Sequence, residues 1–187
     1  MFNIEKKEEM LNNEAQVLIN LIEKRKSVFP KDYIDQPIDD QILEDLVKYG
    51  TMAPNHKRTR PWKYQIFKGE EKVQLGQELQ AIYKHNTPDH LFLEKKYNDI
   101  GFKTTQAGAI ISIVCDFSPL VPEWEDIAAV SMGVQNMYLL CTALGLGCYW
   151  SSPKIVEQLK NSLIIEEGQR CLGLFYVGNT ELTKSEY

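Results

Sequence analysis

The segment from Pro122 to Gly145 constrains the fold more than any other part of the chain. Pro122 suits the start of a helix, and Gly145 followed by Gly147 suits its end. Between them, apolar residues cover most of the helical circumference: Trp124, Ile127, Ala128, Val130, Val134, Met137, Tyr138, Cys141 and Leu144. A helix that is apolar nearly all round must be buried on nearly all sides. We therefore expect this helix at the centre of the structure, partly covered by a second copy of the chain in an obligate homodimer.

Other apolar patterns predict a sheet with helices around it. The run 109–115 is almost continuously apolar and β-branched, as in a central strand covered on both faces. Three further runs have strand composition: 63–68, 148–150 and 171–177. Helical spacing or capping residues predict further helices after Asn12 or Asn13, Asp39, Gly69 and Ser152-Pro153. Three or four strands among five or more helices indicate an α+β or α/β layered domain.

Length and composition limit the class of protein. The 187 residues suit one domain over 1–187, in which 1–13 form a polar extension without the apolar core of a signal peptide. We therefore expect a cytoplasmic protein. A net charge of −5 argues against a general nucleic-acid binder, and the polar residues and glycines within 127–150 argue against a membrane span. The four cysteines lie in apolar runs without a C-x-x-C pair, which favours buried free thiols over a zinc site or disulfides.

Residues 85–98 are polar and are predicted to form a mobile surface excursion of the kind that can act as a substrate lid. The spacing of His85, Asp89, His90 and Glu94 matches no metal-ligand pattern, so we expect no metal.

The best candidate for chemistry is the basic, proline-bracketed segment 52–62. Pro54 is expected to end the preceding helix, and Pro61 to start an extended stretch. Four of the five residues from His56 to Arg60 can be cationic, which suits an anionic ligand, although a solvated basic turn explains them equally well.

Two other segments could join it in a ligand site. Arg25-Lys26-Ser27 follows a predicted helix, where the cations could either complement the helix dipole or grip a phosphate. The turn from Trp150 to Pro153 precedes another predicted helix, whose unpaired N–H groups suit a carbonyl or an anion. A hydrolase triad lacks its G-x-S-x-G elbow, and Gly145-Leu146-Gly147 lacks the third glycine of a dinucleotide fingerprint. The residues alone therefore predict a site of undetermined chemistry.

Three motifs occur in an order that resembles a known family. They are Arg25-Lys26-Ser27, then Ala53-Pro54-Asn55-His56-Lys57 followed by Pro61-Trp62, then Gly145-x-Gly147-x-x-Trp150-Ser151-Ser152. Together they resemble the nitroreductase-family flavoproteins, in particular the small YdjA-like branch, over roughly residues 18–178.

The resemblance implies an α+β fold with a central mixed sheet flanked by helices, and a homodimer with two FMN molecules at the subunit interface. It implies an enzyme that uses NADH or NADPH to reduce FMN, which in turn reduces a nitroaromatic, a quinone or a similar small acceptor by ping-pong hydride transfer. The flavin N5 atom carries that chemistry, so no catalytic side chain is expected. Two alternatives stay open: a flavin-binding sensor or carrier without turnover, and basic residues that only cap helices or face solvent.

The resemblance also assigns the cofactor-binding residues. Arg25, Lys26 and Ser27 are implied to hold the ribityl phosphate, and Met52 and His56 to touch the flavin. Trp150, Ser151 and Ser152 form the third contributing turn. The chain departs from the branch at Lys26, Met52 and Ser151, where the branch has or often has arginine.

Overall fold

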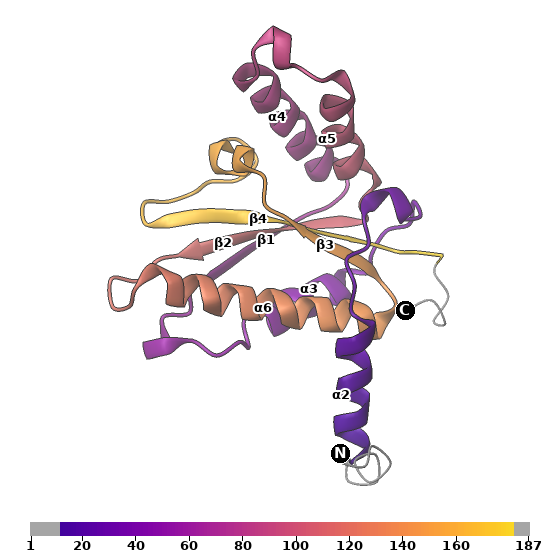
Figure 1. Ribbon diagram of the computed structural model, residues 1–187, viewed down its shortest axis with the longest axis vertical. Coiled ribbons are helices and arrows are strands. Elements are labelled where there is room, and N and C mark those ends of the chain that lie inside the picture. The colour runs from indigo at the N-terminus through magenta and orange to yellow at the C-terminus, as the bar shows by residue number, and fades with distance from the viewer. Residues whose placement is uncertain (1–11, 182–187) are drawn as a thin grey trace, which may run out of the picture.

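The computed structural model describes residues 12–181 and contains one four-stranded sheet in the order β1-β2-β4-β3 (Figure 1). Its strands are β1 (Trp62–Phe67), β2 (Ala109–Asp116), β3 (Gly147–Ser151) and β4 (Gln169–Gly178). All four predicted strands are confirmed, with bounds shifted by one or two residues.

The expectation of a mixed sheet is wrong for the described residues, because all three strand pairings are antiparallel. Two helices connect β1 to β2, so the chain re-enters the sheet where it left, with Phe67 opposite Ile110. A single helix connects β2 to β3, so these two strands run in the same direction. However, β4 lies between them and prevents a parallel pair.

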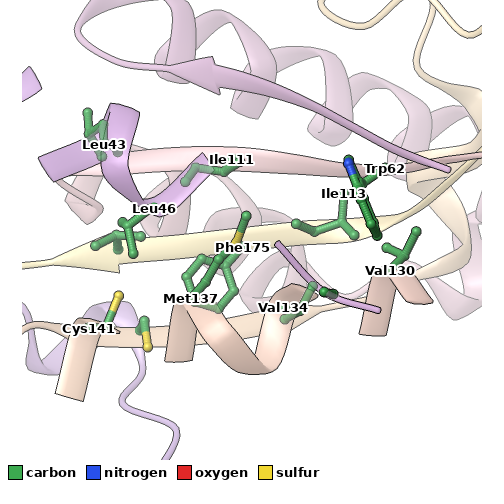
Figure 2. Packing of buried hydrophobic residues seen from close by; sticks show 14 of the residues in the cluster. Leu43, Leu46, Trp62, Ile111, Ile113, Val130, Val134, Met137, Cys141 and Phe175 are labelled. Carbon is green, nitrogen blue, oxygen red and sulfur yellow. The ribbon is translucent and has the colours of Figure 1, made fainter. Parts of the chain in front are cut away.

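Helices cover both faces of the sheet. On one face lie α3 (Asp40–Gly50) and α6 (Glu123–Leu144), and on the other lie α4 (Glu70–Asn86) and α5 (Glu94–Gln106) (Figure 1). Strand β2 is buried along nearly its whole length, as its continuous apolar run predicted. Figure 2 shows the α6 face of the core, where Val134, Met137 and Cys141 point from the helix toward Phe175 of β4.

Three helix ends follow the predicted chemistry. The Asn12 side chain accepts a hydrogen bond from Ala15 N at 2.8 Å and caps α2 (Asn13–Lys24). Asp39 caps α3 in the same way through Gln41 N. Gly145 ends α6 with a φ of 72°, a left-handed conformation that favours glycine. Asn13 therefore belongs to a helix, and the rest of the predicted polar extension, 1–11, lies outside the described residues.

The predicted surface excursion is instead part of a helical hairpin. The end of α4, a short turn η3 (Asp89–Leu91) and α5 occupy residues 85–98, and Lys72 of α4 donates to the carbonyl groups of Thr105 and Ala107 at the end of α5. Thr104 is the one buried residue of α5. Because so little of this helix faces the core, the sequence of α5 lacks the apolar stripe by which an amphipathic helix is recognised.

The prediction of a helix after Ser152-Pro153 is also wrong. Only a 3₁₀ segment, η4 (Lys154–Gln158), forms there, with Pro153 as its N-cap residue and no side-chain capping hydrogen bond among the described residues. The next backbone N–H groups, of residues 160–162, donate instead to the carboxylate of Glu78 on α4, at 2.7–2.9 Å. These donors are therefore not available to extend a helix, while the apolar residues Val156, Leu159 and Leu163 still reach the core.

The four cysteines are buried free thiols, as predicted. Burial raises the pKa of Cys115 to about 12 and the pKa of Cys171 to about 11. Helix α6 would by length and composition also fit a membrane span, but its buried residues pack against the sheet.

Helices α2 and α6 both leave large apolar side chains uncovered. No residue of α2 is buried, and Val17, Leu18 and Ile22 are about half exposed. In Figure 1 this helix projects away from the sheet. On α6, the exposed fraction is 66% for Trp124 and 41% for Met132. The expectation that α6 is buried nearly all round is therefore not met within one chain.

Candidate functional site

Tyr138, on α6, joins two of the three predicted segments. Its hydroxyl accepts a hydrogen bond from Trp150 N at 2.7 Å and lies 3.3 Å from the hydroxyl of Ser27. The guanidinium carbon of Arg25 lies 5.2 Å from the centre of the Tyr138 ring, within the range of a cation–π contact. We call Arg25, Ser27, Tyr138 and Trp150 the Tyr138 cluster.

Local backbone structure explains why these residues meet. Arg25 ends α2, with its N–H bonded to the Leu21 carbonyl, and three residues later Val28 N donates to the carbonyl of Cys148 on β3 at 2.9 Å. This bond ties the segment after α2 to the outer edge of the sheet, close to Trp150.

The donor set of the Tyr138 cluster and its neighbours suits a phosphate. Arg25 and the exposed Lys26 bring positive charge, and the exposed Ser27 brings a hydroxyl. The indole nitrogen of Trp150 is buried and has no hydrogen-bond partner within residues 12–181. Ser151 is half-buried and Ser152 is exposed at the end of β3.

Met52 follows α3 and lies beside the stretch of α6 that carries Tyr138. It borders a groove of about 430 Å³ between α2, α3 and α6, and Asn136 in this groove donates to the carbonyl of Tyr49 at 3.2 Å. The lining is almost entirely apolar: Leu21, Tyr49, Met52, Asn136, Leu139, Leu140 and Ala143.

His56 is not part of this arrangement within one chain. Its Nδ1 atom lies 2.6 Å from Oε2 of Glu125, in the first turn of α6. Glu125 and Tyr138 lie thirteen positions apart along this helix, which is about 20 Å at 1.5 Å per residue. The structure therefore separates His56 from the predicted residues Arg25, Ser27 and Trp150, which meet at Tyr138.

The loop around His56 has an unusual backbone. Lys57, Arg58 and Arg60 have φ angles of 50°, 57° and 51°, a region that residues other than glycine rarely adopt. Asp126, only 1% exposed, holds this loop by accepting a hydrogen bond from the Thr59 hydroxyl at 2.7 Å. Its other oxygen accepts from Ser118 N at 2.9 Å.

Sequence reasoning missed Asp126 and the role of Tyr138. Tyr138 was counted only as one apolar position of the helix, because its spacing does not reveal the partners of its hydroxyl. Asp126 stands in the first turn of a helix, where an acidic residue is common without any special role.

The chain belongs to the Nitroreductase family, whose model matches residues 22–179. It is 25% identical over 172 residues to "Putative NAD(P)H nitroreductase YfhC" of Bacillus subtilis, covering 89% of this chain and 86% of that protein. It is also 25% identical over 147 residues to "Putative NAD(P)H nitroreductase YdjA" of Escherichia coli, covering 76% and 78%.

Solved structures show the same fold. A nitroreductase-like family protein from Bacillus cereus superposes with a TM-score of 0.72 at 25% identity, over 89% of this chain and 87% of that one. The FMN-dependent nitroreductase NfnB from Mycobacterium smegmatis, solved in complex with NADPH, gives 0.70 at 15% identity, over 90% of each chain. The resemblance inferred from the three motifs is thus confirmed at the level of family and fold.

We expect Tyr138→Phe to lower the free energy of unfolding by about 1–3 kcal/mol, because it leaves the N–H of Trp150 without its acceptor. Denaturant unfolding measures this change. Tyr97→Phe is the matched control, since the Tyr97 hydroxyl has no hydrogen bond within residues 12–181. Equal effects of the two substitutions would contradict the role assigned to Tyr138.

Proposed function

We propose that this protein is a cytoplasmic FMN-dependent oxidoreductase that uses NADH or NADPH to reduce a small organic acceptor, such as a nitroaromatic or a quinone. The observation that carries the proposal is the Tyr138 cluster. The hydroxyl and ring of Tyr138 contact both the Arg25 segment, whose donors suit a phosphate, and the Trp150 turn. The names of the relatives YfhC and YdjA agree with this activity.

In this proposal the residues of the chain bind and orient the cofactor. Arg25, Lys26 and Ser27 hold the FMN phosphate by charge-assisted hydrogen bonds, which are shorter and stronger than neutral ones. Trp150, Ser151 and Ser152 border the same site, and Met52 borders the groove beside α6. Bound FMN supplies hydride acceptance at N5, so the protein needs no nucleophile or general base for that step.

The proposal includes a homodimer whose two FMN sites are each completed by both chains. The exposed apolar residues of α2 and the apolar groove beside Met52 are surfaces that a second copy would cover. The homodimer also explains the distance between His56 and the Tyr138 cluster, because His56 would then contribute to the FMN site of the partner chain.

A flavin-binding protein without turnover is the alternative function, and one experiment separates the two. We expect the purified protein to be yellow and its flavin absorbance to bleach when NADH or NADPH is added without air. The colour should return when a quinone is added, because a ping-pong enzyme passes the hydride on. A yellow protein that neither nucleotide bleaches would favour the sensor or carrier.

We expect Leu18→Glu to weaken dimer assembly and FMN retention together, because it places a charge on the exposed apolar face of α2. Val134 is unsuitable for this test, since it is 1% exposed and points into the core of its own chain (Figure 2). Light scattering with flavin absorbance on one chromatogram measures both effects. Ile164→Glu, at a residue 79% exposed in the loop before β4, is the matched control and should leave both unchanged. A Leu18→Glu protein that stays dimeric and fully loaded would contradict this interface.

A further inference from the structure

We propose that the loop 55–60 and Trp124 form a site for the adenosine end of NADPH, in which Arg58 and Arg60 bind the 2′-phosphate. The inference rests on the proposed function, because there the nicotinamide dinucleotide is the reductant. It adds a binding site and a preference for NADPH over NADH.

The backbone of this loop is strained. Lys57, Arg58 and Arg60 all have left-handed φ angles, and none is glycine. Such conformations persist only where the surrounding structure enforces them, and they cluster at ligand sites and active sites. Here the strain falls on the two arginines themselves, so the backbone conformation sets the direction in which each side chain leaves the loop.

Hydrogen bonds from buried and loop residues support this strained loop. Asp126 is buried, and its two carboxylate oxygens are used to fix Thr59 and the backbone at Ser118. The Asn55 side chain accepts a further hydrogen bond from Arg60 N at 3.1 Å. A buried carboxylate is costly unless it is well bonded. The hydrogen bonds of the Asp126 carboxylate fix the loop that carries Arg58 and Arg60 against the start of α6.

The loop carries four side chains that can be cationic, and they differ in their partners. Two cation-capable side chains of the loop are engaged within the fold: His56 with Glu125, and Lys57 with the carbonyl of Leu120 at 3.1 Å. Arg58 and Arg60 are exposed, and no hydrogen bond or ion pair of either guanidinium is found within residues 12–181. Guanidinium groups match the geometry of a phosphate and bind it bidentately.

A hollow lies beside this loop. It measures about 260 Å³ and lies against Trp124, whose exposed fraction is 66%. Bases stack readily on an exposed tryptophan ring. The lining residues are Pro54, Asn55, His56, Trp124, Glu125, Ala128 and Met132.

Together these features favour the 2′-phosphate over the other phosphates of the dinucleotide. It is a terminal phosphate that carries nearly two negative charges near neutral pH, which two guanidinium groups complement, whereas each pyrophosphate group carries one. Arginine is also the residue that accommodates this group in other dinucleotide sites. NADH has only a hydroxyl at the same position and would leave both arginines without a ligand.

The binding test uses the purified protein and two probes that need no flavin chemistry. Calorimetry should show adenosine 2′,5′-bisphosphate binding about tenfold to a hundredfold more tightly than adenosine 5′-monophosphate. The double variant Arg58→Ala/Arg60→Ala should abolish this difference. Lys84→Ala/Lys95→Ala removes two exposed cations from α4 and α5 and should preserve it. Trp124→Ala should weaken both probes by a similar factor, through loss of stacking.

The kinetic test compares kcat/KM for NADPH with kcat/KM for NADH. We expect the wild-type ratio to favour NADPH and to fall about tenfold to a hundredfold in the arginine double variant. The site would be overturned if the two adenosine probes bound equally, bound independently of the arginines or did not bind. An unchanged ratio of kcat/KM for NADPH to kcat/KM for NADH in the double variant would also overturn it. Arginine-dependent binding without reduction by either nucleotide would sustain the site and reject the oxidoreductase, so the two proposals fail separately.

Discussion

The packing of α6 against the sheet is the contact on which the rest of the structure depends. Val134, Met137 and Cys141 are buried between this helix and the strands. Glycine at position 133 lets α3 approach closely, because a Cβ atom there would collide with the backbone of Gly50. One long helix is thereby held rigidly, and each of its ends positions a different group of polar residues.

The two ends of α6 are organised by different kinds of interaction. Near its carboxyl end, the Tyr138 hydroxyl and ring join residues from α2 and β3 by contacts that leave the cations at the surface. At its amino end, the buried Asp126 holds a strained loop in which two arginines remain exposed. Both arrangements place positive charge beside apolar surface, which suits ligands that combine phosphate with an aromatic ring.

Much of the fold could be predicted from the sequence because the signals were local. The continuous apolar run of β2 and the caps at Asn12, Asp39 and Gly145 depend on neighbouring residues alone. Helix α5 was missed because it is mostly exposed and has no apolar stripe. The helix expected after Pro153 failed because Glu78, far away in the sequence, captures the backbone donors of residues 160–162.

The candidate site could also be predicted only where its signals were local in the sequence. The motifs identified Arg25, His56 and Trp150 individually, but not the distance between them, which depends on the length of α6. Tyr138 and Asp126 were missed because their partners are remote in the sequence: residues 27 and 150 for the tyrosine, and residue 59 for the aspartate. Local patterns do not report such long-range hydrogen bonds.

The most direct test of the account is complementation between two variants, Arg25→Ala and His56→Asn, each of which is expected to retain little FMN. If each site takes Arg25 from one chain and His56 from the other, a mixed dimer has one intact site and one doubly defective site. Purified heterodimers carrying two different affinity tags should then bind about one FMN per dimer, while both parent homodimers bind little. Heterodimers that bind no more FMN than their parents would contradict a site shared between chains.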